Sequence, residues 1–181
     1  MELQPHPDSP CSPANAIHVR AVRPGDDKLS LLFTVDGDIR AIFVPEKGSA
    51  QRTDGLWRHS CFEAFIRSPG RQGYVELNLS PSGAWAAYRF DDYRAGMQSA
   101  EIAPPTIKVQ KDNAHLGLVA EVDLASIAEL NGPDPWQLAL SAVIETQDGS
   151  LSHWALAHPQ GAADFHHPDC FVLDLPPAGE P

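Results

Sequence analysis

The sequence has few cysteines, and their spacing excludes the common thiolate sites. Three cysteines, Cys11, Cys61 and Cys170, stand among 181 residues, and no two form a Cys-x-x-Cys pair. A small, odd number of cysteines is typical of a reducing compartment and argues against a zinc-thiolate centre. Cys61 and Cys170 fall in apparent strands, where we interpret them as small buried hydrophobic side chains.

Positive charge is also scarce. The chain has 13 Lys and Arg against 24 Asp and Glu, a formal net charge of −11. A nucleic-acid-binding surface needs clustered basic residues to meet the phosphates, and an anionic membrane surface makes the same demand. We therefore expect no nucleic-acid partner and no membrane partner. The sequence does not predict the oligomeric state.

Long hydrophobic runs are absent. No stretch approaches the roughly 20 apolar residues of a membrane-spanning helix. The first 16 residues contain no basic segment followed by an apolar one, so they do not resemble a secretory signal. The expected location is therefore cytoplasmic.

What the chain does contain is short alternating segments separated by turn residues. Hydrophobic residues make up 43% of the sequence, and 17 prolines and 13 glycines mark frequent turns. This pattern predicts an all-β fold, a jelly-roll-like antiparallel β-sandwich with one short helix. The expected strands are Ala16–Val22, Lys28–Val35, Ile39–Val44, Cys61–Ile66, Tyr74–Leu79, Trp85–Phe90, Ile107–Lys111, Leu116–Asp123, Trp136–Glu145, Leu151–Leu156 and Cys170–Leu175.

The predicted organisation is one domain with two short tails. Residues 1–15 are rich in proline and predict a disordered tail, residues 16–175 form the sandwich, and residues 176–181 form a C-terminal tail. Asp36-Gly37-Asp38 predicts a hairpin turn between two strands. Leu124–Leu130 is the helix candidate, with Asp123 as its N-cap.

The stretch from Leu56 to Phe90 combines acids, an amide and aromatic residues on strands. Side chains alternate between the two faces of a strand, so Glu63 lies opposite the apolar face of its strand. In the next strand, Glu76 and Asn78 likewise share the face that the aliphatic residues leave. A sheet face with this mixture is either solvated or a binding surface.

Three segments resemble the DOMON-like domains of bacterial proteins, which are similar to family 9 carbohydrate-binding modules. The segments are LWRHSCFEAFI, YVELNLSPSGAWAAYRFDDYR and SHWALAHPQGAADFHHPDCFVLDL. The resemblance implies a β-sandwich that holds a sugar or a haem on one face, and it does not imply catalysis. Sugar-binding relatives grip the ligand between aromatic rings, a role that Trp57, Trp85 and Trp154 could fill. Haem-binding relatives use a Met and a His as axial ligands, and Met97 is the one methionine besides Met1.

A sugar presents apolar ring faces and directional hydroxyl groups, so its site needs an aromatic platform together with polar donors and acceptors. Glu121, Gln137, Ser141 and Glu145 could join the polar face, whereas Tyr88 and Phe90 are interpreted as core residues. The predicted ligand-binding residues are Trp57, Glu63, Glu76, Asn78, Trp85, Arg94 and Trp154.

Several alternatives remain open at this point. Glu63 and Glu76 could act as the carboxylate pair of a glycoside hydrolase, which needs them about 5–10 Å apart. The histidine-rich loop, with Asp164 and Asp169, could bind a metal ion through His153, His158, His166 or His167, and Asp54, Asp91 or Asp92 could bind calcium. A haem-binding redox domain and a protein-interaction domain are further possibilities. We predict no catalytic residue and no metal site, and the sequence names no cofactor.

Overall fold

The computed structural model describes residues 1–10 and 13–179, which form twelve strands in one curled, antiparallel sheet. The strands are β1 (Glu2–Pro5), β2 (Ala14–Gly25), β3 (Lys28–Gly37), β4 (Cys61–Arg67), β5 (Tyr74–Leu79), β6 (Trp85–Phe90), β7 (Gln98–Ser99), β8 (Thr106–Lys111), β9 (His115–Asp123), β10 (Trp136–Glu145), β11 (Leu151–Ala155) and β12 (Leu173–Leu175). The 3₁₀ turns are η1 (Ile39–Ala41), η2 (Leu56–Arg58), η3 (Ala128–Leu130) and η4 (Pro168–Cys170).

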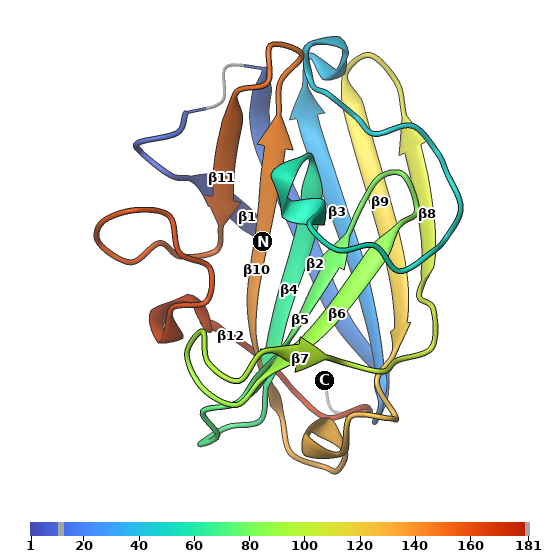
Figure 1. Cartoon of the computed structure of the whole chain (residues 1–181), viewed down its shortest axis with the longest axis vertical. Helices are drawn as coiled ribbons and strands as arrows, with labels where there is room; N and C mark the ends of the chain where they lie inside the picture. The colour runs from blue at the N-terminus through green and yellow to red at the C-terminus, as the bar shows by residue number, and fades with distance from the viewer. Residues whose placement is uncertain (11–12, 180–181) are drawn as a thin grey trace.

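The sheet folds into two layers, which lie one behind the other in the view of Figure 1. The first layer, which we call the front layer, has the order β7-β6-β5-β4-β10-β11, with β12 added to β10. The second, the back layer, has the order β2-β3-β9-β8. Strand β1 joins them, because Glu2 and Leu3 pair with β2 while Gln4 and Pro5 pair with β11. The predicted antiparallel β-sandwich is confirmed.

The main core fills the space between the layers. Every second side chain of a strand points inward, as the period of a β-strand requires. Phe33 of the back layer meets Phe62 of the front layer with ring centroids 4.9 Å apart, and both are fully buried. Leu77 and Trp136 join the same cluster.

The predicted disordered tail is wrong for residues 2–5, and also for residues 14 and 15, which begin β2. Residues 2–5 form β1, and Leu3 is fully buried in the main core. Pro5, the one proline within β1, ends the strand and pairs with Trp154 of β11. Cys11 lies outside the described residues.

Two segments with apolar residues at every third position were misread as other elements. Ile39–Val44 forms the 3₁₀ turn η1 and a loop instead of a strand, so the predicted hairpin at Asp36-Gly37-Asp38 is also wrong. In Leu124–Leu130 only η3 is helical. The buried residues, Ile39 and Ile42 in one segment and Leu124, Ile127 and Leu130 in the other, follow the period of three that a 3₁₀ turn presents. No helix in the described part of the chain is long and apolar enough to cross a membrane.

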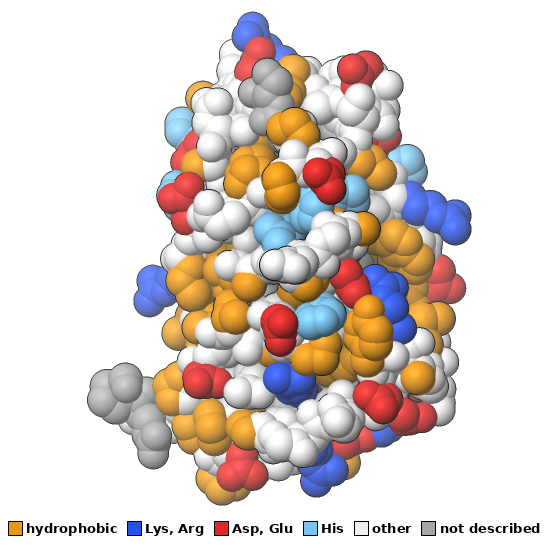
Figure 2. Space-filling view, turned by 90° about the vertical axis from the view of Figure 1, so that its left-hand side faces the viewer, with side chains coloured by type: hydrophobic (Ala, Val, Ile, Leu, Met, Phe, Trp, Pro, Cys, Tyr) orange, Lys and Arg blue, Asp and Glu red, His pale blue; other side chains and the backbone are white. Residues whose placement is uncertain are grey.

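The outer face of the front layer carries a second, smaller core. Its strand residues include Phe65, Tyr74 and Phe90, and the segment 157–172, which we call the C-terminal loop, covers them with Phe165 and Phe171. Figure 2 looks onto this side of the molecule, where histidine side chains lie among hydrophobic ones over the middle of the face. Of the predicted strand Cys170–Leu175, only Leu173–Leu175 is a strand, namely β12. Cys170 belongs to η4, within the loop that packs over the sheet.

Candidate functional site

A cavity of about 390 Å³ lies between the outer face of the front layer and the segments that cover it. Its volume falls in the range of small-molecule sites, roughly 300–1,000 Å³. The lining residues are Trp57, Glu63, Glu76, Tyr88, Phe90, Arg94, Met97, Val143, His153, Ala163, Phe165 and His166.

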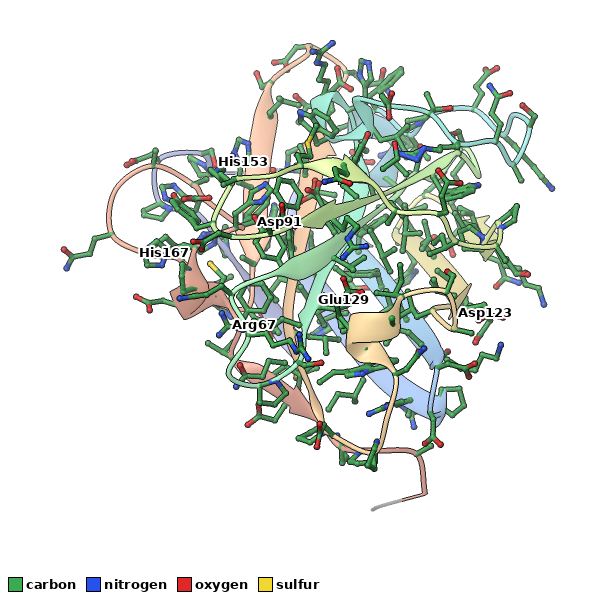
Figure 3. The ribbon with its side chains drawn as sticks, turned by 60° about the horizontal axis from the view of Figure 1, so that its bottom comes forward. Arg67, Asp91, Asp123, Glu129, His153 and His167 are labelled. Atoms are coloured by element: carbon green, nitrogen blue, oxygen red, sulfur yellow. The ribbon has the colours of Figure 1, made fainter. Side chains whose placement is uncertain are left out.

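Another hollow, of about 300 Å³, lies between β5, β6 and η3. Asp91 and Glu129 face it, and both are labelled in Figure 3. Its acid Glu129 is paired with Arg89. The larger cavity is the stronger candidate because it combines several aromatic rings with buried polar groups.

The polar floor of the cavity follows from strand register. Ser141 of β10 pairs with Glu63 of β4, and Glu63 pairs with Asn78 of β5. One step further along, Glu76 of β5 pairs with Tyr88 of β6. Directly opposed residues in an antiparallel sheet point to the same face, so this register gathers all five side chains on one side.

Glu63 is a buried acid, with 3% of its surface exposed. The Ser141 hydroxyl donates a hydrogen bond to its Oε2 over 3.0 Å. Burial, together with the neighbouring carboxylate of Glu76, raises the pKa of Glu63 to about 8. At neutral pH the floor of the cavity therefore contains a largely protonated carboxylic acid.

Glu76 is the second acid of the floor and is 6% exposed. Burial raises its pKa, although the Asn78 amide donates a hydrogen bond to its Oε1 over 2.6 Å. His166 Nε2 lies 3.8 Å from Glu76 Oε2. Burial, aided by the charge of Arg94, lowers the pKa of His166 to about 4, so the imidazole is neutral at pH 7 and offers Glu76 no charge.

Aromatic residues form the walls. Trp57, in η2, is 40% exposed and stands edge-on to Tyr88, with ring centroids 6.1 Å apart. The Tyr88 hydroxyl donates a hydrogen bond to Asp54 over 2.6 Å, which fixes its ring. An exposed tryptophan that lines a cavity is suited to stacking on a ligand.

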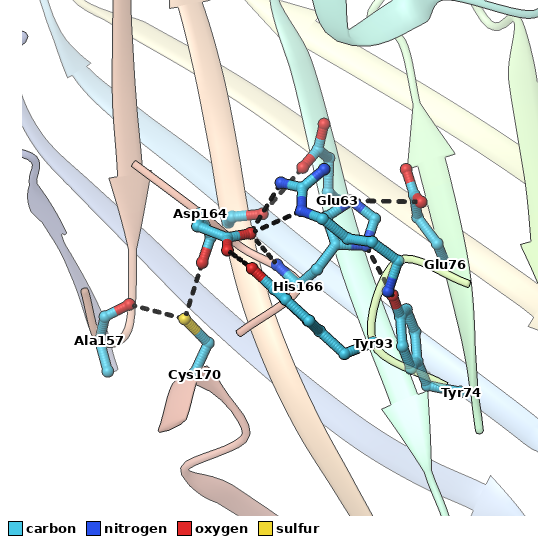
Figure 4. A network of polar contacts seen from close by, with 10 residues as sticks. Glu63, Tyr74, Glu76, Tyr93, Ala157, Asp164, His166 and Cys170 are labelled. Atoms are coloured by element: carbon cyan, nitrogen blue, oxygen red, sulfur yellow. Dashed lines mark hydrogen bonds and ion pairs between the residues drawn. The ribbon is translucent and has the colours of Figure 1, made fainter. Parts of the chain in front are cut away.

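The roof of the cavity is built by polar contacts, shown in Figure 4. Asp164 in the C-terminal loop accepts hydrogen bonds from the Arg94 guanidinium, over 2.7 and 3.2 Å, and from the Tyr93 hydroxyl. Arg94 has φ +52°, and its backbone N–H donates to the Tyr74 hydroxyl over 3.2 Å. It is the one non-glycine residue with positive φ in the described ranges, and such backbone strain gathers at functional sites.

The cysteine at the end of this loop helps to hold it. The Cys170 thiol donates to the carbonyl oxygens of Ala157 and Asp164 over 3.4 and 3.3 Å. Burial raises the pKa of Cys170 to about 11, so the group is an unreactive thiol at neutral pH. The interpretation of Cys170 as a small buried side chain agrees with this environment.

The structure brings four of the seven predicted residues to the cavity, namely Trp57, Glu63, Glu76 and Arg94. Asn78 lies beneath the surface, fully buried, and acts on the cavity through its bond to Glu76. Arg94 pairs with Asp164, which the sequence did not identify as its partner.

Trp85 and Trp154 do not reach the cavity, so their predicted binding role is wrong. They are 5% and 3% exposed and belong to the main core. In β6, Trp85 alternates with Ala86 and so takes the inward face. In β11, Trp154 also points inward, and its Nε1 donates to the Ser152 hydroxyl over 3.0 Å.

Several cavity residues were assigned to other roles or missed. Tyr88 and Phe90, interpreted as core, are buried but line the cavity. The sequence contained a sign of this, because Tyr88 and Phe90 alternate with Trp85 along the strand and so lie on the opposite face, together with Ala86. His153, Phe165 and the thioether side chain of Met97 complete the walls. They come from other strands and loops, and no periodicity links them to Glu63. Figure 3 shows His153 and His167 on the side of the molecule that the C-terminal loop covers, with Asp123 on the far side.

The additional polar candidates divide between the layers. Ser141 joins the floor, as the alternation of its strand suggested. Gln137 and Glu145 lie on the same strand but bind Arg67 and His59 away from the floor. Glu121 stands on β9 of the back layer, where it accepts a hydrogen bond from Ser30, so it cannot join the site.

The histidines of the C-terminal loop have other partners. His158 Nε2 contacts the Gln4 carbonyl oxygen over 2.8 Å, and His166 Nδ1 contacts the Tyr74 hydroxyl over 2.8 Å. Among residues 1–10 and 13–179, no three His, Cys, Asp or Glu side chains gather as a metal-binding group.

The cavity is poorly suited to haem. A haem presents a broad apolar macrocycle, whereas the floor of this cavity consists of two buried carboxyl groups, Glu63 and Glu76. His166 stands edge-on to Phe65 and Phe90, with centroids 4.9 and 5.1 Å apart, and its Nδ1 is bonded.

No family model matches the sequence, and no curated protein matches it significantly. Solved structures do match the fold. A candidate carbohydrate-binding protein from Bacteroides uniformis has a TM-score of 0.66 at 14% identity, with 94% of this chain and 84% of that chain covered.

A carbohydrate-binding module of family 9 from Caldicellulosiruptor kristjanssonii also matches, in two complexes. The complex with glucose has a TM-score of 0.53 at 13% identity and covers 92% of this chain and 78% of that chain. The complex with cellotriose has a TM-score of 0.54 at 11% identity and covers 94% and 80%. The chain therefore has the fold of the family 9 carbohydrate-binding modules.

Proposed function

We propose that this protein is a non-catalytic carbohydrate-binding domain that holds a small sugar in the cavity of the front layer. The observation that carries the proposal is the meeting of an exposed tryptophan, Trp57, with two buried acids, Glu63 and Glu76, in one cavity of about 390 Å³. The similarity of the fold to modules solved with glucose and cellotriose supports it. A kinship with DOMON-like domains and a cytoplasmic location are part of the same proposal.

The geometry divides the recognition of a sugar between two kinds of surface. The apolar face of a pyranose ring stacks on Trp57, beside Tyr88, where it removes apolar surface from water. The hydroxyl groups reach the floor, where Glu63 and Glu76 offer both an acid O–H and acceptor oxygens. Each of these acids is already held by a neighbour, Ser141 or Asn78, so little side-chain entropy is lost on binding.

Glycoside hydrolysis is the second candidate, because two carboxyl groups share the cavity. An acid and a base need environments that push their pKa values apart. Here burial raises the pKa of both Glu63 and Glu76, so the site shifts the two pKa values in the same direction and does not push them apart. Binding without turnover fits this arrangement better.

The test is a titration of the purified protein with glucose and cello-oligosaccharides, followed by tryptophan fluorescence and by calorimetry. Three of the four tryptophans are buried, at 1–5% exposure, so a saturable fluorescence change reports on Trp57. We expect the change in the wild-type protein and its absence in Trp57→Phe. In calorimetry, Trp57→Ala should weaken binding at least about tenfold, or about 1.4 kcal/mol.

Leu32→Ala is the matched control, because Leu32 is also 40% exposed but lies on the back layer. Its affinity should equal that of the wild type. The proposal fails if no sugar produces a saturable signal by either method. Release of free sugar from the oligosaccharides would move the assignment to hydrolysis, and binding of hemin alone, with a Soret band, would move it to haem.

A further inference from the structure

Within the described residues, no Lys or Arg forms an ion pair with either acid of the cavity floor. The charge of Arg94 opposes the rise in the pKa of both acids, but its guanidinium donates its hydrogen bonds to Asp164. The nearest imidazole, that of His166, is kept neutral by burial, which lowers its pKa to about 4. Buried carboxylates are normally paired or neutralised, and here Glu63 is neutralised by its own proton. A cation placed between the two acids can take the place of that proton.

Each acid also has an oxygen without a hydrogen bond. Among the described residues, no donor reaches Oε1 of Glu63, whose Oε2 accepts from Ser141. Likewise Oε2 of Glu76 has no donor within hydrogen-bonding distance, because His166 stands 3.8 Å away. Both side chains are more than nine-tenths buried and line the cavity. These two oxygens are unused acceptors that face the ligand space.

The walls of the cavity favour a cation as well. The rings of Trp57, Tyr88 and Phe165 line the same space. The face of an aromatic ring carries partial negative charge and attracts an ammonium group, by about 0.5–2 kcal/mol. A neutral hydroxyl group gains nothing comparable from these rings.

We propose that the sugar bound in this cavity is an amino sugar, a monosaccharide with a protonated primary amine that lies between Glu63 and Glu76. The inference rests on the proposed function and specifies the ligand class for the same site. An ammonium group has three N–H donors and no acceptor, which matches the two unused oxygens of the floor. The aromatic walls then contact the ring of the sugar.

Binding of the amine changes the protonation of the floor. The groups that face Glu63 are Glu76 on β5, Cys61 on its own strand, and Arg94 and His166 above it. An ammonium ion between the acids favours their charged forms. Glu63 therefore releases its proton to the buffer when the amine binds at neutral pH, while the amine keeps its own.

The test is calorimetry at about pH 6.5 with three sugars of the same ring, namely glucosamine, N-acetylglucosamine and glucose. Glucosamine alone carries the positive charge, and acetylation removes that charge while leaving the nitrogen in place. We expect glucosamine to bind at least about tenfold more tightly than either of the others. Repeating the titration in buffers of different ionisation enthalpy should show net proton release for glucosamine alone.

Variants assign the effect to the floor. Glu63→Gln keeps the shape of the side chain but not its charge, and should weaken glucosamine binding about tenfold while changing glucose binding less than about threefold. Glu76→Gln should behave in the same way, and it serves as the second test if Glu63→Gln folds poorly by circular dichroism. Glu101→Gln, at an exposed position outside the cavity lining, is the control and should bind all three sugars as the wild type does.

The outcomes separate the two proposals. If glucose or N-acetylglucosamine binds as tightly as glucosamine, the amino-sugar inference is overturned and the carbohydrate site remains. If glucosamine binds best but both glutamine variants keep that preference, the amine lies elsewhere and the inference is also overturned. If no sugar binds, both proposals fail.

Discussion

Glu63 is a carboxylic acid in a position where charge is disfavoured. Its side chain is 3% exposed and shares the floor of the cavity with Glu76, and these surroundings raise its pKa to about 8 from an ordinary value near 4.5. Because the raised pKa belongs to the folded protein alone, the acid makes stability depend on pH. Glu63 contributes most below about pH 4.5, and its contribution falls as the pH rises through 8.

We therefore predict that Glu63→Gln becomes more stable than the wild type in alkaline solution. Glutamine cannot ionise, so the variant avoids the free energy needed to bury a charge, which is about 1.4 kcal/mol for each unit of pKa shift. The free energy of unfolding from urea titrations should exceed that of the wild type by several kcal/mol, on the order of 5, above pH 8.

The difference between the two proteins should shrink steadily as the pH falls toward 4.5. In acid, both proteins should lose stability for a different reason. The pKa of His166 is lowered in the folded state, so the free energy of unfolding falls as the pH drops from about 6.5 through 4, equally in the wild type and the variant. A difference between the two proteins that does not vary with pH would contradict the prediction.

At the level of single residues, the sequence identified Glu63, Glu76 and Trp57 because acids and a tryptophan stand out from their neighbours. It could not place Trp85 or Trp154, because a tryptophan is equally suited to a core and to a sugar platform. What decides between the two roles is whether the side chain lies on the face of the strand that points into the core. In β6, the pairing of Tyr88 with Glu76 places Tyr88 on the cavity face and Trp85 on the core face.

Among the structural elements, the C-terminal loop determines whether the cavity has a roof. Asp164 is the contact between this loop and the crossing that follows β6, since it binds both Tyr93 and Arg94. Arg94 is half exposed, so the pair adds little to global stability, about 1 kcal/mol or less. Its effect is to hold the C-terminal loop and the crossing after β6 in one arrangement over the site.

We predict that Asp164→Asn weakens sugar binding several-fold with little change in the melting temperature. The asparagine can still accept a hydrogen bond but loses the charge that binds the guanidinium. Amide hydrogen exchange in residues 157–167 should become faster, because the loop opens more often.

Asp38→Asn is the control for this experiment, because it breaks a comparable exposed pair, with Arg40, far from the loop along the chain. It should leave both the affinity and the exchange of residues 157–167 unchanged. Equal exchange rates in Asp164→Asn and the wild type would show that the roof does not depend on this contact.

Strands were easier to predict than the segments between them. Tyr74–Leu79, Trp85–Phe90 and Trp136–Glu145 have the predicted bounds because alternation and flanking turn residues agree there. In Ile39–Val44, apolar and polar residues also alternate in part, but the side chains that are buried in the core are those of Ile39 and Ile42. A period of three within a short segment is easily mistaken for a period of two.

At the scale of the whole molecule, β1 is the strand that joins the layers. Leu3 is fully buried between them, and the strand has no other buried side chain. We predict that Leu3→Ala lowers the free energy of unfolding by about 2–5 kcal/mol, as expected for a large-to-small change in a core. Urea denaturation measures this value.

Leu32→Ala gives the matched comparison, because Leu32 is 40% exposed on the outer face of the back layer. A substitution there should change stability by no more than about 0.5 kcal/mol. Equal effects at Leu3 and Leu32 would mean that β1 is not required for the sandwich.

The layer arrangement itself was beyond the reach of the sequence. Alternation tells which residues share a face within one strand, but it does not tell which strands become neighbours. Glu121 shows the limit, because its strand has the same pattern as β10 and yet lies in the other layer. The site required the register of β4, β5 and β10, which only the folded chain contains.

The pairing of β1 with β11 has a consequence for how the chain reaches its native state. Gln4 lies beside Ala155, so nearly the entire sequence separates two residues of one ladder. Contacts between distant residues form slowly, because the closure of a long loop precedes any gain from pairing. The hairpins β2–β3 and β5–β6 have short connections and can form early. The pairing of β1 with β11, which joins the two layers, should form last. Refolding should therefore end with a slow phase in which protection of β1 and β11 appears together.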